Sequence, residues 1–485
     1  MENVVVETRY GKVKGERTGN VSVWKGIPYA KPPVGKLRFR PPESLEAWNG
    51  VYDATSFGAV AMQPESPLMS VLEGGDHVDM SEDCLNLNIW SPAADGKRRP
   101  VMVWVHGGAF MNGAGSSEIY DGTSFATNGD VVVVTLNYRL GVMGFLHLED
   151  EQYAASGNCG ILDQIEALKW VKENIEAFGG DPEQITIFGE SAGAMSIGIL
   201  LAIPAVKGLF HQAILQSGAA RNVLTTERAT RVTTKVLRNL GIDSGDLSRL
   251  GDIPAEEILQ AAKDIPPMAL GPVMDGYVIP EHPETLLAKG ASKDVPILIG
   301  TNKDEYRLFT FFDLTWQQID EAEIKRRLHK MFGPLWQKIQ AELAGQTLNQ
   351  QLFERLMSTH VFTFPAIRLA ELKLHENAQV WMYRFDWESP VFGGGLKSSH
   401  AMEIPFVWDN LDKQGMEALI GDAPDQHMAE QMHQAWIAFA HHGNPNHSDL
   451  PDWKPYDTEN RTTMIFNTES KLVNDPNQAE RHIFE

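Results

Sequence analysis

The chain has 485 residues and a formal net charge of −22, with a hydrophobic fraction of 43% that is ordinary for a globular protein. So acidic a chain is a poor partner for nucleic acid and for anionic membrane surfaces. No apolar run reaches spanning length, and the first residues lack the basic and apolar regions of a signal peptide. We therefore expect a cytoplasmic protein that binds neither nucleic acid nor membrane.

The first part of the chain reads as strands and loops. Residues 1–60 contain alternating strand-like runs with glycine turns, residues 61–80 lack periodicity and read as a long loop, and residues 85–90 are another strand. Between residues 100 and 220, runs rich in β-branched residues alternate with helical patterns. That alternation predicts an α/β fold with a parallel sheet covered by helices on both faces.

The second part adds helices to this sheet. Residues 221–290 are helix-rich, and residues 316–376 read as helical throughout. Further strands are predicted from residue 295 and over 379–387, and residues 427–443 form a helix before the end of the chain. We find no repeat or flexible linker, so we expect one domain over residues 1–485.

One G-x-S-x-G pattern stands out, at residues 189–193, with Ser191 at its centre. A short strand pattern precedes it and an apolar, helix-compatible run follows. Strand, tight turn and helix is the context of a nucleophile elbow, which holds a serine hydroxyl above a sheet beside the first amides of a helix. Side chains at Gly189 or Gly193 would clash with the neighbouring strand and helix.

A nucleophilic serine needs a base within hydrogen-bond reach and an acid that orients the base. Among 64 carboxylates, Asp304 and Glu305 stand out because they directly follow a buried strand. Among fifteen histidines, His400 is favoured because it lies in a loop after a strand. The histidines of the helix at residues 427–443 are explained as exposed polar positions. The residues alone leave the choice between Asp304 and Glu305 open.

An oxyanion site is also predicted. The segment WVHGGAF, residues 104–110, follows a strand and precedes a helix-like stretch, as an HGGG-type loop does. Its backbone amides, with that of Ala192, could bind a developing negative charge. His106 precedes the serine in the chain, so we interpret it as a residue that shapes this loop.

Several motifs between residues 24 and 408 occur in the order of one known family. They are WKGIPYAKPPVGKLRF, SEDCLNLNIW, VWVHGGAF, LNYRLGVMGFL, GNCGILDQ, FGGDPEQITIFGESAGAMS, GTNKDEYRLF and HAMEIPFVW. The chain resembles the type-B carboxylesterases, whose fold is the α/β-hydrolase fold. The resemblance implies that the helical segments at about 221–290 and 316–376 are insertions that form part of an active-site gorge.

Carried over position by position, the resemblance implies a catalytic triad of Ser191, Glu305 and His400. It also implies an oxyanion hole formed by the backbone amides of Gly108, Ala109 and Ala192. Glu190 and Ser217 match two secondary positions of the family behind the triad.

The resemblance also implies two structural salt bridges, Arg38 with Glu82 and Arg139 with Asp163. Cys84 is expected to be free, because the partner cysteine of secreted relatives is missing here. Tyr306 stands where many relatives carry glycine.

The expected function is that of a serine carboxylesterase acting on small to medium carboxylic esters through an acyl-enzyme. No metal or cofactor is implied. Two alternatives are a non-catalytic binding protein related to cholinesterases and a lipase that acts on longer acyl chains. The expected partner is a small-molecule ester, and the expected state is a monomer or small homo-oligomer.

Overall fold

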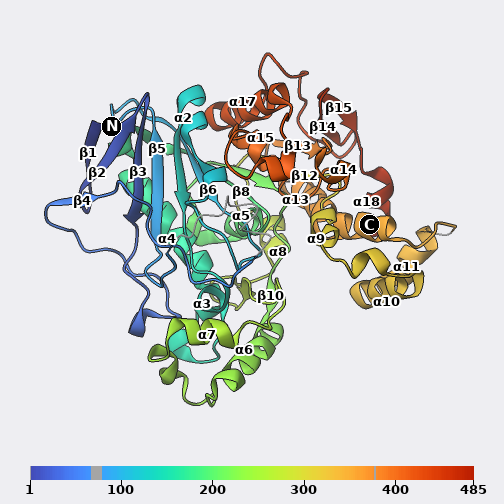
Figure 1. The fold of residues 1–485 in the computed structure, drawn as a ribbon, viewed down its shortest axis with the longest axis horizontal. Coiled ribbons are helices and arrows are strands. Elements are labelled where there is room, and N and C mark those ends of the chain that lie inside the picture. The colour runs from blue at the N-terminus through green and yellow to red at the C-terminus, as the bar shows by residue number, and fades with distance from the viewer. Residues whose placement is uncertain (1, 67–78, 344, 376–377) are drawn as a thin grey trace.

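The computed structural model describes residues 2–66, 79–343, 345–375 and 378–485. One large sheet crosses the molecule, with thirteen strands in these ranges (Figure 1). Its strands are β1 Glu2–Thr8, β2 Gly11–Thr18, β3 Val21–Pro28, β4 Val51–Asp53, β5 Asn86–Ser91, β6 Arg99–Val105, β7 Val132–Leu136, β8 Gly180–Glu190, β9 Gln212–Gln216, β12 Ile297–Asn302, β13 Val380–Phe385, β14 Thr462–Phe466 and β15 Lys471–Asn474. A separate pair is β10 Leu224–Thr225 and β11 Val273–Met274.

The middle of the sheet is parallel, as predicted. The strand order is β1-β2-β3-β5-β7-β6-β8-β9-β12-β13-β14-β15, with β4 beside β2. All neighbours from β7 to β14 pair in parallel, whereas the pairs at both ends of this order are antiparallel. Because parallel strands share a direction, the carboxyl ends of β6, β8 and β12 meet at one edge of the sheet.

Helices cover both faces of the sheet. The long helices are α4 Cys159–Asn174, α5 Ala192–Ala202, α6 Thr226–Leu240, α10 Glu321–Phe332, α13 Phe364–Leu374 and α17 Gln426–His442. The shorter ones are α2 Thr123–Gly129, α3 Gly141–Phe145, α7 Ala255–Ala261, α8 Pro283–Ala288, α9 Arg307–Phe311, α11 Leu335–Glu342, α12 Gln350–Ser358, α14 Val391–Gly394, α15 Ile404–Trp408, α16 Glu417–Ile420 and α18 Gln478–Phe484.

The alternating side chains of the strands separate two hydrophobic cores. Val101 and Val103 of β6 pack with the cluster that includes Leu168 of α4, on one face. Met102 and Trp104 of the same strand belong to the cluster on the other face, which includes residues of α15 and α17. This alternation follows from the two-residue period of a strand. In Figure 1, α2, α15 and α17 lie together above the sheet, and α6 and α7 lie at the opposite end of the molecule.

The predicted helical insertions are present, with one correction. Residues 316–376 are not helical throughout, because Gly333 ends α10 with a φ of 52° and residues 345–349 are not helical. The last part continues from α12 through a π-helical turn, Thr359–Thr363, into α13. Most of the loop predicted over residues 61–80 lies outside the described residues.

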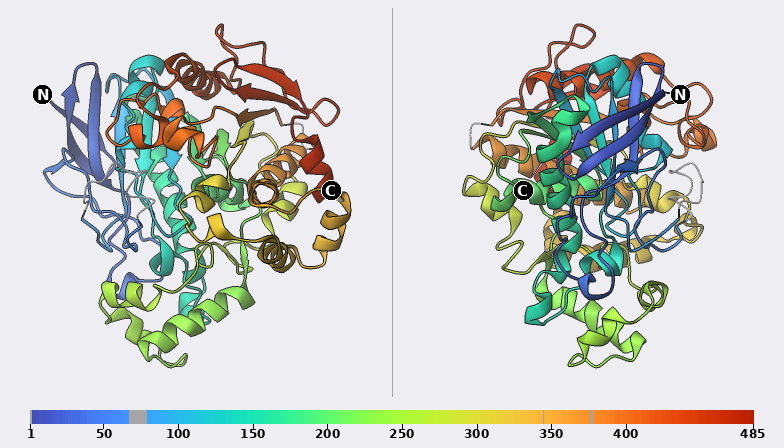
Figure 2. Two further views of the ribbon diagram at one scale, coloured as in Figure 1. Left: turned by 45° about the vertical axis from the view of Figure 1, so that its right-hand side comes forward. Right: turned by 90° about the vertical axis from the view of Figure 1, so that its left-hand side faces the viewer.

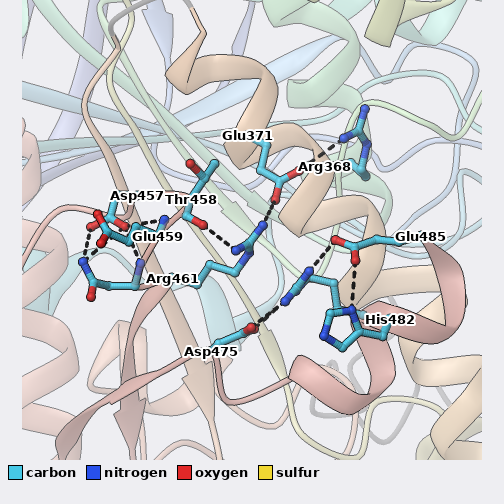
Figure 3. A network of polar contacts seen from close by, with 11 residues as sticks. Arg368, Glu371, Asp457, Thr458, Glu459, Arg461, Asp475, His482 and Glu485 are labelled. Atoms are coloured by element: carbon cyan, nitrogen blue, oxygen red, sulfur yellow. Dashed lines mark hydrogen bonds and ion pairs between the residues drawn. The ribbon is translucent and has the colours of Figure 1, made fainter.

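The C-terminal segment contains elements that the sequence patterns did not reveal, namely β14, β15 and α18. A polar network joins them to α13 (Figure 3). Arg461 reaches Glu371 of α13 at 3.1 Å, and Arg481 of α18 pairs with Asp475 at 2.6 Å and with Glu485. Figure 2 shows α18 beside the helices of residues 316–376 at one edge of the molecule.

Four smaller expectations can be compared with the structure. The ion pairs Arg38–Glu82 and Arg139–Asp163 are both present, each at 2.6 Å. Cys84 and Cys159 are buried and unpaired. His433 of α17 is not an exposed helix position as expected, because its buried ring contacts Phe125 and bonds the carbonyl of Val407 at 2.8 Å. In the described ranges, every helix is too short or too polar to span a lipid bilayer.

Candidate active site

Ser191 lies at the sharp turn between β8 and α5. Its backbone has φ 54° and ψ −121°, a conformation that costs strain in any residue other than glycine. Space for the turn comes from the flanking glycines. A Cβ added at Gly193 would lie 1.9 Å from the Val105 carbonyl oxygen, and one at Gly189 would lie 2.5 Å from the same atom. The two glycines of the motif therefore let β8 and α5 close against the end of β6.

Three side chains from distant parts of the chain meet at this turn. The Oγ of Ser191 lies 2.8 Å from Nε2 of His400, and Nδ1 of His400 lies 2.6 Å from Oε2 of Glu305. Glu305 follows β12 and is fully buried, while His400 lies between β13 and α15 and is 6% exposed. The chain of contacts runs from hydroxyl to imidazole to carboxylate. Such a chain can move a proton from the serine to the histidine.

In the turn after β12, the two carboxylates that the sequence left as alternatives, Asp304 and Glu305, have different surroundings. The backbone N–H of Asn302 donates to Oε1 of Glu305 at 2.8 Å, which turns that side chain toward His400. Asp304 instead donates its backbone N–H to the carbonyl of Ser398. In the part of the chain that the structure describes, its Oδ2 is buried without a hydrogen-bond partner.

The glycine-rich loop after β6 lies against the serine. A Cβ added at Gly107 would lie 2.9 Å from the carbonyl oxygen of Glu190 and 3.2 Å from Cβ of Ser191, so a side chain there would push the loop away from the serine. Gly108 and Ala109 both have positive φ, 102° and 55°. Across the described ranges, the N–H groups of Gly108 and Ala109 donate to no other protein group. With the N–H of Ala192 at the start of α5, they are donors available to a substrate oxygen.

His106 fixes the shape of this loop. Its Nδ1 bonds the carbonyl of Gly107 at 2.9 Å, and its ring stacks on Tyr138 at 4.5 Å between ring centres. The Tyr138 hydroxyl donates to the His106 carbonyl at 2.9 Å. Burial lowers the pKa of His106 to about 4, so the ring is neutral at neutral pH. This placement supports a loop-shaping role and keeps His106 out of the contacts around Ser191.

Glu190 adds a second carboxylate beside the imidazole. Its Oε1 lies 3.1 Å from Nε2 of His400, although it makes no hydrogen bond within the described residues. Burial raises the pKa of Glu190 to about 8. For His400, burial acts to lower the pKa, but the carboxylates of Glu190 and Glu305 outweigh it and raise the pKa to about 9. A protonated His400 is thus stabilised by the charge of Glu305, and by a second negative charge where Glu190 is ionised.

A buried polar network supports the triad from behind, and the sequence patterns did not reveal it. Glu403 accepts hydrogen bonds from the side chains of Asn302 at 2.7 Å and Gln216 at 3.1 Å. Asn302 also donates to the carbonyl of Ser399, next to His400, at 2.7 Å. Burial raises the pKa of Glu403. Glu403 lies in the same family motif as His400, and Asn302 in the same motif as Glu305. This shared position was the signal in the sequence that could have identified the network.

Ser217 directly follows Gln216, whose carbonyl accepts the backbone N–H of Ser191 at 2.9 Å. It has φ 54°, and its N–H donates to the carbonyl of Gly300 in β12 at 2.9 Å. Its hydroxyl is buried and finds no hydrogen-bond partner among the residues described. The following residue, Gly218, closes on the backbone of Ser191, since a Cβ there would lie 2.6 Å from the Ser191 carbonyl oxygen. Ser217 therefore belongs to the backbone support of the elbow.

Aromatic rings surround the imidazole. The ring centres of Phe309 and Phe362 lie 5.2 and 4.7 Å from that of His400. Phe362 is buried, whereas Phe309 is 45% exposed. These rings limit water around the histidine and offer an apolar surface. No three His, Cys, Asp or Glu side chains in the described ranges are grouped so that they could hold a metal ion.

Comparisons with known proteins show the family to which this chain belongs. The sequence profile of the carboxylesterase family matches residues 2–484. The para-nitrobenzyl esterase of Bacillus subtilis is 45% identical, covering 99% of this chain and 98% of that protein. The phenmedipham hydrolase of Pseudarthrobacter oxydans is 36% identical, covering 97% and 96% of the two chains.

Solved structures give the same result for the fold. A carboxylesterase of Geobacillus stearothermophilus has 48% sequence identity and a TM-score of 0.90, covering 99% of this chain and 100% of that one. A structure of a PNB esterase has 43% identity and a TM-score of 0.87, with 99% of each chain covered. The fold is therefore the α/β-hydrolase fold. By sequence and by structure, this chain belongs to the carboxylesterase family and is a carboxylic ester hydrolase.

Proposed function

We propose that the protein hydrolyses carboxylic esters through an acyl-enzyme formed on Ser191. The observation that carries this proposal is the pair of short contacts that link Ser191 to His400 at 2.8 Å and His400 to Glu305 at 2.6 Å. A serine hydroxyl is a weak nucleophile at neutral pH unless a base accepts its proton as it attacks. The imidazole of His400 is the base, and Glu305 holds its Nδ1–H so that Nε2 faces the serine.

The reaction proceeds in two halves. Ser191 Oγ attacks the ester carbonyl carbon while its proton passes to Nε2 of His400. The tetrahedral intermediate collapses, the C–O bond to the alcohol breaks, and His400 gives its proton to the leaving oxygen. A water molecule then attacks the acyl-enzyme with His400 again as base, which releases the carboxylic acid and restores the serine hydroxyl.

The negative oxygen of each tetrahedral intermediate needs hydrogen-bond donors. We assign this role to the backbone amides of Gly108, Ala109 and Ala192. The amides of Gly108 and Ala109 donate to no other group within the described ranges, and the loop that carries them is held by His106. One such donor is worth about 3 kcal/mol of transition-state stabilisation.

The proposed substrates are small to medium esters, and the proposed site of action is the cytoplasm. The rings of Phe309 and Phe362 beside His400 support an apolar substrate group. The two cysteines are buried and unpaired, as expected of a protein kept in a reducing compartment. We further propose a single catalytic domain over residues 1–485, acting as a monomer or small homo-oligomer.

The test combines turnover with active-site labelling. Wild-type protein is expected to hydrolyse p-nitrophenyl butyrate and to gain one organophosphate adduct on Ser191, located by peptide mass spectrometry. Ser191→Ala is expected to lose about 10⁴-fold or more in kcat, with an unchanged circular dichroism spectrum and melting temperature.

Three results would overturn parts of this proposal. Retained turnover in Ser191→Ala would exclude Ser191 as nucleophile. Absence of both turnover and labelling in wild-type protein would favour a non-catalytic binding protein. A series of p-nitrophenyl esters whose rates rise toward long acyl chains, with activation by emulsified substrate, would favour a lipase.

A further inference from the structure

A hollow of about 300 Å³ is lined in part by chain neighbours of residues in the candidate site. Phe110 lines it, and this residue directly follows Ala109 of the glycine-rich loop. Val361 also lines it and precedes Phe362, whose ring packs on His400. A third wall begins at Arg221, three residues after Gly218, which closes on the backbone of Ser191. Three segments that reach the candidate site therefore also line the hollow.

The charge of this hollow differs from that of the whole protein. Its lining includes Arg221, Arg228 and His360, but no Asp or Glu. The chain as a whole carries a net charge of −22. Arg38 and Arg139, in contrast, each form a two-point ion pair with a carboxylate. Within the described residues, neither Arg221 nor Arg228 has a carboxylate within ion-pair distance.

His360 adds a partly buried polar group to the two arginines of the hollow. Its ring is held between Phe332 and Phe484, at 4.9 and 5.6 Å between ring centres. Its Nδ1 is shielded from water and has no hydrogen-bond partner in the part of the chain that the structure describes. Burial and the charge of Arg221 lower the pKa of His360, so the imidazole is neutral at neutral pH. Its other ring nitrogen, Nε2, can donate one hydrogen bond beside the two fixed positive charges when it carries the proton of the neutral ring.

We propose that this hollow binds a carboxylate carried by the ester substrate, and that Arg221 and Arg228 select such substrates over neutral ones. The inference rests on the proposed esterase function. Guanidinium groups bind carboxylates through paired, charge-assisted hydrogen bonds, and they remain charged at every pH at which the enzyme works. Met268, Pro272 and Pro365 supply an apolar lining for the carbon chain that bears the carboxylate.

The test uses two pairs of esters, because the carboxylate could lie on either side of the ester bond. On the acyl side, mono-p-nitrophenyl glutarate is compared with its neutral carboxamide analogue. On the alcohol side, 4-(butyryloxy)benzoate is compared with 4-(butyryloxy)benzamide. Within each pair, the measured quantity is the ratio of kcat/KM for the charged ester to that for the neutral ester, after subtraction of spontaneous hydrolysis.

We expect wild-type protein to prefer the charged ester in at least one pair. Arg221→Gln and Arg228→Gln are each expected to lower that ratio by about tenfold, with Arg221→Lys retaining part of it. Arg231→Gln is the matched control. Arg231 lies on the same helix as Arg228 but outside the hollow, where it donates to the Glu227 carbonyl, so its replacement should leave the ratio unchanged.

The outcomes separate this proposal from the esterase proposal. Equal kcat/KM for charged and neutral esters in both pairs would overturn the carboxylate site and leave the esterase function intact. A preference that Arg221→Gln and Arg228→Gln do not change would also overturn it, because the charge would then be recognised elsewhere. Failure to hydrolyse any of the four esters would count against the esterase function itself.

Discussion

The strand ends of the central sheet and the helical lobe formed by α10, α11, α12 and α18 are built in different ways. The strands that carry the candidate site are buried over most of their length, and β6 and β12 expose no residue. The lobe has a small hydrophobic cluster of its own, which includes Leu328, Trp336 and Ile483. In Figure 1 the lobe lies at the edge of the molecule, away from the N-terminal strands.

The two regions meet next to the candidate acid. Tyr306 donates its backbone N–H to Oγ of Ser358 at 2.9 Å, and its ring lies 6.0 Å from that of Phe353 of α12. Tyr306 thus connects the turn that holds Glu305 to the lobe, which explains why a large residue fits at this position. The comparison indicates that the strand ends fix the reacting groups, while the lobe forms a wall whose stability can vary with little effect on the chemistry.

The largest expected effect comes from the turn after β12. Glu305→Gln keeps the shape of the side chain but removes the charge that stabilises protonated His400, so we expect kcat to fall about 10³-fold or more. Asp304→Asn is the matched control, because within the described residues Asp304 forms no hydrogen bond or ion pair with His400, so the change should alter kcat less than about threefold. Steady-state kinetics with p-nitrophenyl butyrate measures both. Equal losses in the two variants would contradict the assignment of Glu305.

The difference between the sheet and the lobe is tested next by a Leu→Ala substitution that creates a cavity in each region. Leu328 in the lobe and Leu200 in α5 are both fully buried, and each Leu→Ala change should cost about 3 kcal/mol. We expect Leu328→Ala to raise hydrogen exchange within the lobe and to leave kcat at 25 °C within about threefold. Leu200→Ala should destabilise the sheet core and lower kcat as well. Hydrogen exchange by mass spectrometry, together with kinetics, distinguishes the two. A large loss of kcat in Leu328→Ala would show that the lobe takes part in positioning.

The smallest effect concerns the pH profile. His400 must be neutral to accept a proton, so activity is lost as the pH falls through its raised pKa. Glu190→Gln removes one of the three carboxylates, Glu190, Glu305 and Glu403, that raise this pKa. The acid limb of kcat/KM should therefore move to lower pH by about one unit. A limb that does not move, or that moves to higher pH, would contradict the electrostatic role of Glu190.

Local patterns predicted those parts of the site that depend on local geometry. Strand, turn and helix around Ser191 are contiguous in the chain, and so are the glycines that make the turn possible. The choice of Glu305 over Asp304 was not local, because Asp304 bonds Ser398 and Glu305 bonds His400, and both partners lie more than 90 residues further along the chain. Only the family resemblance separated these two carboxylates at the level of sequence.

The buried polar groups and the C-terminal elements could not be predicted in the same way. Gln216 and Glu403 are polar residues at ordinary positions, and their inward direction depends on how β9 and the segment before α15 pack. His433 looked like an exposed helix residue, since a helical pattern alone does not reveal that Phe125 covers it. Strand β14 spans only Thr462–Phe466, and its pairing partner β13 lies far away in the chain.

The contact of Gly193 with the Val105 carbonyl has a consequence for the design of variants. Val105 leads directly into the loop of Gly108 and Ala109, and Gly193 lies two residues after Ser191. One backbone contact therefore sets the spacing between the nucleophile and the amides that face it. The surrounding walls, among them the hollow lined by Arg221, lie outside this contact. Libraries that vary the walls can alter selectivity while the spacing of the reacting groups is preserved, whereas any side chain at position 193 would change both at once.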